Sequence, residues 1–174
     1  MSRVEMAVLL DLDGTLIDSK PGIAASIRVA CDETGLAQPD EAVLHAFIGP
    51  PLGYSLEEHY GLTDTAFIDG FVAAYRRAYL ADGMRNGVIY PGIEDALAEF
   101  RRGGERLFVA TSKPRVHAET MLGEYGLAGY FDSIHGSELD GERFDKTELI
   151  AHILGSESLD NGAAIMVGDR RFDI

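Results

Sequence analysis

Residues 7–15 read Ala-Val-Leu-Leu-Asp-Leu-Asp-Gly-Thr, an apolar run that leads into two aspartates and a glycine. A short apolar run closed by glycine is typical of a buried strand that ends at a turn. Because side chains alternate along a strand, we expect Asp11 and Asp13 to point the same way and Leu12 to point toward the core. Two neighbouring carboxylates repel each other, which indicates a compensating cation or a shared proton. Taken alone, the pair could also be two solvated acids.

Polar side chains follow two further apolar runs. Residues 107–110 lead into Thr-Ser-Lys at 111–113, and residues 163–167 lead into Gly-Asp-Arg-Arg-Phe-Asp at 168–173. Lys146 lies between these two segments, at the start of an amphipathic stretch. In open α/β sheets, ligands bind outside the carboxyl ends of the strands. We therefore expect these polar groups to converge on one site.

The hydrophobic pattern divides the chain into a helical part and an alternating part. The stretch from Ser19 to about Gly83 shows only helical periodicity, and beyond it helical and strand-like segments alternate. Such alternation predicts a parallel sheet with right-handed crossovers. We expect an α/β core made of residues 1–17 and 85–174, with a helical cap domain at 18–84 inserted after the first strand.

Local signals place several helix ends in the helical part. Gly35 is expected to end the first helix, and Asp40 to start the next one. A stripe of aromatic residues and alanines over 67–79 predicts the core of a small helical bundle. The single cysteine, Cys31, lies on an apolar helix face and is expected to pack there.

Composition limits the classes of partner. The chain has 174 residues, of which 46% are hydrophobic, and its formal net charge is −14. That charge argues against nucleic acids and anionic membrane surfaces as partners, and it would repel a phosphorylated substrate unless the site supplies positive charge. A lone cysteine, the lack of a secretory signal and the lack of a long apolar run favour a cytoplasmic protein with no membrane span.

The motifs occur in an order that resembles the haloacid dehalogenase-like hydrolase superfamily, and within it the phosphoglycolate phosphatase branch. The set consists of DxDGT at 11–15, Thr-Ser at 111–112, Lys146 and GDxxxD at 168–173, and it covers essentially the whole chain. The resemblance implies a Rossmann-like core with a cap. It also implies a magnesium-dependent phosphatase that hydrolyses small phosphorylated metabolites through an aspartyl-phosphate intermediate.

The two aspartates of the first motif are the expected catalytic pair. A carboxylate that attacks phosphorus divides one difficult step into two, and the resemblance assigns this role to Asp11. Asp13, two residues on, is expected to protonate the leaving alkoxide and later to deprotonate the attacking water. Thr15 is expected to support them.

Three acids at a site for a dianionic substrate require a hard cation, and Mg²⁺ is the expected one. The resemblance implies that the carboxylates of Asp11 and Asp169 and the backbone carbonyl of Asp13 bind it. A helix that begins at Gly168 would place Asp169 and Asp173 on one face, so Asp173 is expected in a supporting role. Ordinary helix-start acids are the alternative for this pair.

Hydroxyl and ammonium groups are expected to bind the substrate phosphate. Thr111 and Ser112 could hold a phosphoryl oxygen or could cap the following helix, and the resemblance places phosphate binding on Thr111. A cation in the first turn of a helix opposes the helix dipole, so Lys146 suggests a purpose beyond the helix. The resemblance makes it the residue that holds Asp11 and the phosphate together. Lys113 is the rival candidate, with an exposed loop lysine as its alternative.

A proline-stiffened segment is the candidate for substrate specificity. Gly49, Pro50 and Pro51 join two helices of the expected cap. Such a loop could cover the site when the cap closes and contact the part of the substrate beyond the phosphate. A plain turn between helices is the alternative.

Other functions share these motifs. A 5′-nucleotidase or a pyrophosphatase is the main alternative, followed by a β-phosphoglucomutase-like enzyme and by a non-catalytic module that binds phosphorylated metabolites. The expected partner is a small phosphate ester, and the chain could be a monomer or a homodimer. Because the chain stops at Ile174, one residue after the last motif, we also expect the C-terminal end of the core to be missing.

Overall fold

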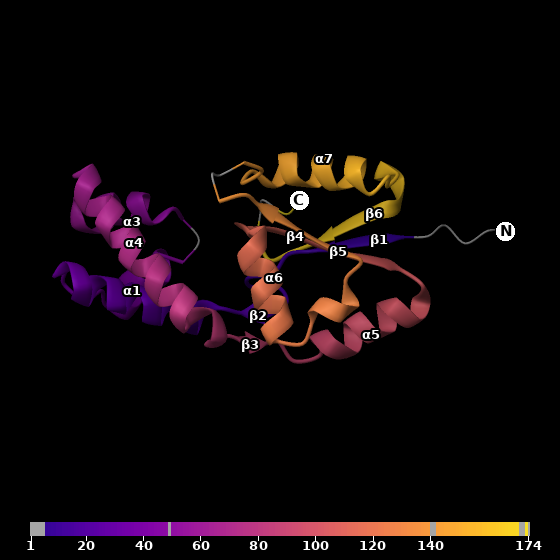
Figure 1. Cartoon of the computed structure of the whole chain (residues 1–174), viewed down its shortest axis with the longest axis horizontal. Coiled ribbons are helices and arrows are strands. Elements are labelled where there is room, and N and C mark those ends of the chain that lie inside the picture. The colour runs from indigo at the N-terminus through magenta and orange to yellow at the C-terminus, as the bar shows by residue number, and fades with distance from the viewer. Residues whose placement is uncertain (1–5, 49, 140–141, 171–172, 174) are drawn as a thin grey trace. The chain divides into compact units, whose positions relative to one another are not determined.

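The structure is a computed structural model that divides the chain into two compact units (Figure 1). The sheet unit comprises residues 1–18 and 88–174, and the helical unit comprises residues 19–87. The structure describes residues 6–48, 50–139, 142–170 and 173.

A four-stranded parallel sheet forms the sheet unit, in the order β5-β4-β1-β6. Its strands are β1 (Ala7–Leu10), β4 (Arg106–Pro114), β5 (Ser133–Ser137) and β6 (Ala164–Val167). All four residues of β1 are buried because this strand pairs on both sides and both of its faces are covered. The predicted α/β fold with a parallel sheet is confirmed.

Helices cover both faces of the sheet (Figure 1). They are α5 (Ile93–Gly103), α6 (Arg115–Glu124) and α7 (Lys146–Ser156). Val8 and Leu10 belong to the core beneath α5 and α6, whereas Ala7 and Leu9 belong to the core beneath α7. Because successive side chains of β1 point to opposite faces of the sheet, this one strand contributes residues to both cores. Short 3-10 turns, η2 (Ala128–Tyr130) and η3 (Asn161–Ala163), complete the unit.

Strand β4 is longer than the sequence suggests. It continues through Thr111, Ser112 and Lys113 to Pro114, which pairs with Ser137 of β5 after a shift in register. The residue that caps α6 is consequently Pro114, and no side chain caps this helix. The prediction that Thr111 or Ser112 could cap the helix is wrong, because pairing with β5 keeps both residues in the strand.

A two-stranded antiparallel ribbon adjoins the helical unit in the sequence. It consists of β2 (Ile17–Asp18) and β3 (Val88–Ile89), where Ile17 pairs with Ile89. The chain thus leaves the sheet unit through β2 and returns through β3.

The helical unit has four helices and a 3-10 turn. These are α1 (Lys20–Thr34), α2 (Glu41–Ala46), α3 (Leu52–Tyr60), α4 (Thr65–Ala81) and η1 (Gly83–Arg85). Helix α1 ends at Gly35, which has a φ of +72°, and Asp40 caps α2 by accepting the N–H of Val43 at 2.9 Å. Both predicted boundaries are confirmed. Cys31 packs in the bundle core together with Phe71 and Ala74 of the aromatic stripe.

None of the helices in the described part of the chain has both the length and the apolar character that a membrane crossing needs.

Candidate active site

The two aspartates of the first motif follow the carboxyl end of β1. The N–H of Asp11 donates to the carbonyl oxygen of Val167 at 2.9 Å, which extends the pairing of β1 with β6 by one residue. Leu12 is fully buried in the core, as the alternation along the strand predicts. The side chain of Asp11 is buried, whereas that of Asp13 is 24% exposed. Protein therefore encloses the first aspartate more completely than the second.

Lys146 turns its ammonium group from the start of α7 toward the end of β1. Its Nζ donates to Asp11 Oδ1 at 2.8 Å and to the carbonyl oxygen of Ala110 at 2.8 Å. It also lies 3.0 Å from Oδ1 of Asp173. An ammonium group has three N–H donors, and these partners can use all of them. The helix start itself is capped by Asp145, because its carboxylate accepts two backbone N–H groups of the first turn.

The charge of Asp11 is incompletely compensated by the protein. Burial raises the pKa of the Asp11 carboxyl above its ordinary value, and this effect exceeds the opposing effect of Lys146. Asp173 raises the same pKa further, because two like charges disfavour ionisation. An additional cation near Asp11 would favour its charged form.

Asp169 comes close to the first motif because the residue opposite has no side chain. Gly14 turns the chain with a φ of +94°, a left-handed conformation that favours glycine. A Cβ at position 14 would overlap the carboxylate of Asp169. That carboxylate is 39% exposed, and its Oδ1 lies 3.9 Å from Nε of Arg170. Gly14 is therefore needed both for the turn and for the approach of Asp169.

Two hydrogen bonds with Arg170 hold Asp173 beside the site. In the described residues after β6, no helix begins at Gly168, so that prediction is wrong. The Asp173 carboxylate accepts the N–H of Arg170 at 3.0 Å, and the Asp173 N–H donates to the Arg170 carbonyl oxygen at 3.0 Å. A Cβ at Gly168 would overlap the Asp173 side chain. The missing side chain of this glycine therefore leaves room for the Asp173 carboxylate.

Three carboxylates meet at this edge of the sheet. One oxygen from each of Asp11, Asp169 and Asp173 lies within 4.8 Å of the others. Together with Asp13, four carboxylates face the ammonium groups of Lys146 and Lys113 and the guanidinium of Arg170, which leaves an excess of negative charge. A divalent cation would offset that excess, and carboxylate oxygens are the ligands that Mg²⁺ prefers. The donor set therefore fits a magnesium ion.

Lys113 also reaches the site. Its Nζ lies 2.9 Å from Oδ2 of Asp13, and its side chain is only 9% exposed. The alternative of an exposed loop lysine is therefore wrong. Lys113 and Lys146, considered as rivals from the sequence, both contribute, and each pairs with a different aspartate of the first motif.

The position of Lys113 at the site could have been predicted from its spacing to Thr111. Thr111 and Lys113 are two positions apart, so they share one side of a strand if the strand continues past Ala110. In the structure β4 does continue, and the Thr111 hydroxyl accepts the N–H of Lys113 at 3.2 Å. Thr111 is buried. Ser112, between them, donates instead to the carbonyl oxygen of Phe144 at 3.1 Å.

Of the remaining expected residues, Thr15 is in the sheet unit and the specificity segment is in the helical unit. The hydroxyl oxygen of Thr15 and Oδ1 of Asp13 are both buried and lack a hydrogen-bond partner among the described residues. Pro51 precedes α3 as its capping residue, and Pro50 is exposed. Gly49 lies outside the described residues.

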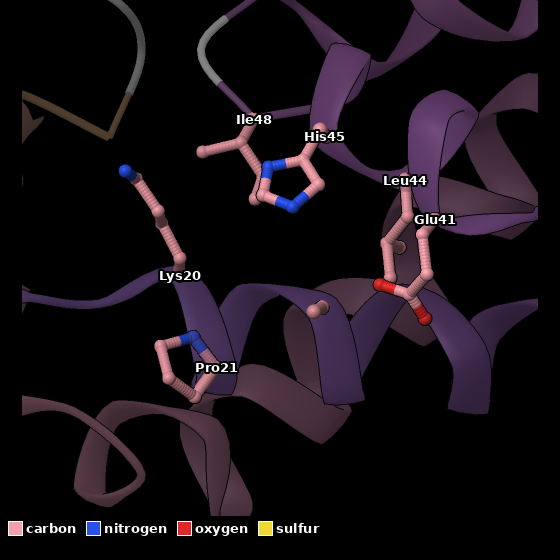
Figure 2. Close-up of a pocket in the computed structure, with 7 residues that line it drawn as sticks. Lys20, Pro21, Glu41, Leu44, His45 and Ile48 are labelled. Atoms are coloured by element: carbon pink, nitrogen blue, oxygen red, sulfur yellow. The ribbon is translucent and has the colours of Figure 1, made fainter.

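A pocket of about 190 Å³ lies within the helical unit, between the start of α1 and the end of α2 (Figure 2). In Figure 2, Lys20 lines one side of it, and His45 and Ile48 line the other. All the residues that line this pocket belong to the helical unit, whereas the aspartates described above belong to the sheet unit.

Comparison with known proteins identifies the family. The family model for haloacid dehalogenase-like hydrolases matches residues 8–174, which include all the motif residues above. The chain belongs to the haloacid dehalogenase-like hydrolase family.

Several relatives within this family are phosphatases by name. The chain is 39% identical over 167 residues to a 5′-nucleotidase of Pseudomonas aeruginosa, covering 96% of this chain and 75% of the relative. It is 33% identical over 172 residues to a phosphoglycolate phosphatase of Cupriavidus necator, covering 97% and 74%. The crystal structure of a predicted phosphatase from Clostridium acetobutylicum superposes with a TM-score of 0.85 at 37% identity, covering 98% of this chain and 79% of that one. This haloacid dehalogenase-like chain is a phosphoric monoester hydrolase, as the motifs predict.

Proposed function

We propose that this phosphatase hydrolyses small phosphorylated metabolites with Mg²⁺ and with Asp11 as the nucleophile. The observation that carries the proposal is the position of Asp11. It is buried at the end of β1, with Lys146 at 2.8 Å from one carboxylate oxygen and Asp13 two residues on. A carboxylate held in this way is oriented toward one attack direction, which is the main requirement in phosphoryl transfer.

In the first step, a carboxylate oxygen of Asp11 attacks phosphorus, and the bond from phosphorus to the ester oxygen breaks. Asp13, in its protonated form, gives its proton to the departing alkoxide. In the second step, Asp13 takes a proton from a water molecule, and the resulting hydroxide attacks the aspartyl-phosphate at phosphorus. Inorganic phosphate leaves and the Asp11 carboxylate is restored.

The remaining residues supply charge and hydrogen bonds. The carboxylates of Asp11 and Asp169 and the backbone carbonyl of Asp13 would hold Mg²⁺, with Thr15 and Asp173 in support. When bound, the ion would neutralise negative charge on the phosphoryl oxygens.

Phosphate binding falls to Thr111, Ser112 and Lys146. The Thr111 hydroxyl accepts the Lys113 N–H, and its own proton is left to donate to a phosphoryl oxygen. Ser112 uses its hydroxyl on Phe144, so we expect a smaller contribution from its side chain.

The helical part is proposed to act as a cap over the core of residues 1–17 and 85–174. The compactness of the helical unit, residues 19–87, and its insertion after the first strand support a cap made of residues 18–84. Pro50 and Pro51 would then contact the part of the substrate beyond the phosphate. Changing both prolines to alanine should alter the relative rates across esters more than the affinity for phosphate. A uniform loss across esters would instead show that the segment is only a turn.

A 5′-nucleotidase is the second candidate. The relative of that name is 39% identical to this chain, against 33% for the phosphoglycolate phosphatase, so nucleoside monophosphates are substrates to be tested beside phosphoglycolate.

Phosphate release from a panel of esters decides among these functions. The panel contains phosphoglycolate, nucleoside 5′-monophosphates, pyrophosphate and glucose 1-phosphate, each with Mg²⁺ and with a chelator in its place. Magnesium-dependent release from one ester class, abolished by Asp11→Asn, supports the proposal and names the class. Release that survives Asp11→Asn would overturn it.

A further inference from the structure

We propose that Lys113 is a positioning residue that holds the carboxylate of Asp13 in the orientation needed for proton transfer. The inference rests on the proposed acid–base role of Asp13 and extends it to a residue outside the motif set.

The two oxygens of the Asp13 carboxylate have different surroundings. Oδ2 lies 2.9 Å from Nζ of Lys113, and the lysine side chain is almost fully buried. Oδ1 is buried and has no hydrogen-bond partner among the described residues. Buried polar atoms without a partner are rare, and a catalytic role is one of the explanations for them. Lys113 therefore fixes one oxygen and leaves the other to exchange a proton with the leaving group or with water.

The backbone of Lys113 is itself held in place. Its N–H donates to the Thr111 hydroxyl at 3.2 Å, and its carbonyl oxygen packs directly against Gly136 of β5, where a Cβ would overlap it. The register shift in β4 ends at Pro114, the next residue. These contacts fix where the lysine side chain starts, and a fixed start limits the positions that its ammonium group can reach.

Lys146 cannot take over this task. Its three N–H groups already have Asp11, Asp173 and the carbonyl oxygen of Ala110 as partners. Each lysine therefore serves a different aspartate, one for the nucleophile and one for the acid–base residue. Loss of Lys113 should let Asp13 adopt other rotamers, which affects proton transfer more than phosphate binding.

The test compares esters with poor and good leaving groups. An alkyl phosphate such as phosphoglycolate needs the proton from Asp13, whereas p-nitrophenyl phosphate has a leaving group that departs without much assistance. Lys113→Met should lower the ratio of kcat/KM for the alkyl ester to kcat/KM for the aryl ester by about tenfold, because general acid catalysis contributes roughly 10²–10⁴-fold and misplacement removes part of it. The inhibition constant of inorganic phosphate should stay within about twofold.

Matched variants exclude a general structural effect. Lys113→Arg keeps the charge and should keep the ratio within about threefold of the original. Arg115→Met removes a nearby cation that contacts Glu119 and Glu138, and it should leave the ratio unchanged. Asp13→Asn should lower the ratio at least as far as Lys113→Met does, and the double variant should lower it no further than Asp13→Asn alone. If Lys113→Met does not fold, Lys113→Gln makes the same comparison.

Four results would overturn the inference. An equal loss for both esters with weaker inhibition by phosphate would make Lys113 a phosphate-binding residue. Additive losses in the double variant would show that Lys113 does not act through Asp13. If Asp13→Asn itself leaves the ratio unchanged, the acid–base role of Asp13 fails and the inference fails with it. A shifted ratio for Asp13→Asn but not for Lys113→Met overturns only the inference about Lys113.

Discussion

Nζ of Lys146 lies 2.8 Å from Oδ1 of Asp11, although the two residues are 135 positions apart in the chain. The contact joins the first turn of α7 to the end of β1, and both side chains are more than nine-tenths buried. Each of these buried charges is stabilised mainly by the opposite charge, because water cannot fully solvate either of them. The same lysine also meets Asp173 at 3.0 Å, so one cation balances two buried acids.

Asp11→Asn should abolish turnover without lowering the melting temperature of the metal-free protein. Burial raises the pKa of this carboxyl, so its charged form costs stability at neutral pH, and the neutral amide removes that cost. The increase in melting temperature on addition of Mg²⁺ should shrink or disappear. Thermal melts with and without Mg²⁺ check both points, and a large drop in the metal-free melting temperature would contradict this account of Asp11.

Lys146→Met should destabilise the fold at neutral pH as well as abolish activity. Removing one partner leaves two carboxylates buried without their cation, a change that typically costs about 3–5 kcal/mol. Unfolding in urea measures the loss. Adding Asp173→Asn to the same variant should recover part of the stability, because it removes one of the two uncompensated charges. No recovery in the double variant would show that Asp173 is not coupled to Lys146.

Gly14→Ala should weaken magnesium binding by displacing Asp169. The added Cβ overlaps the Asp169 carboxylate, and the residue also has a φ of +94°. Gly104→Ala is the matched control, because Gly104 has a φ of +82° but open space where a Cβ would lie. Both variants should lose about 1–2 kcal/mol of stability from backbone strain. Only Gly14→Ala should reduce the magnesium-induced increase in melting temperature, and an equal reduction in the control would refute the steric explanation.

Mild acid should lower the stability of the fold, because His135 is held in its neutral form by burial. Burial lowers the pKa of this imidazole below its ordinary value of 6.5, an effect only partly offset by Glu157 and reinforced by His152 and Arg115. As the pH falls below about 6.5, His135 becomes protonated in the unfolded chain before it does so in the folded chain. The free energy of unfolding therefore falls as the pH decreases.

Urea unfolding between about pH 7.5 and 5.5 measures this dependence. His135→Gln should flatten it, because glutamine does not titrate in this range. The amide can still donate a hydrogen bond to Glu157, which lies 3.0 Å from Nε2 of His135 in the original protein. An unchanged slope would assign the pH dependence to other groups.

Several features of the fold could be predicted from local sequence alone. The alternation in β1 is complete within four residues, and the ends of α1 and the start of α2 depend on Gly35 and Asp40 themselves. The sequence pattern did not predict strand β5, because this strand lies at the sheet edge and carries polar residues. Ser133 and His135 contact Glu157 there instead of forming an apolar run. Edge strands lack the continuous hydrophobic pattern that marks a central parallel strand.

Residue types and their spacing along the chain were enough to predict which acids, hydroxyls and lysines make up the motifs, and hence the family and the chemistry they suit. Contacts in three dimensions were needed to show which lysine pairs with which aspartate, that Lys113 belongs to the site, and that Arg170 holds Asp173 there. Periodicity reports which side of its own strand or helix a residue occupies. Contacts between residues about a hundred or more positions apart depend on strand register and on where a glycine leaves room for another side chain. Packing between helices and strands sets both of these.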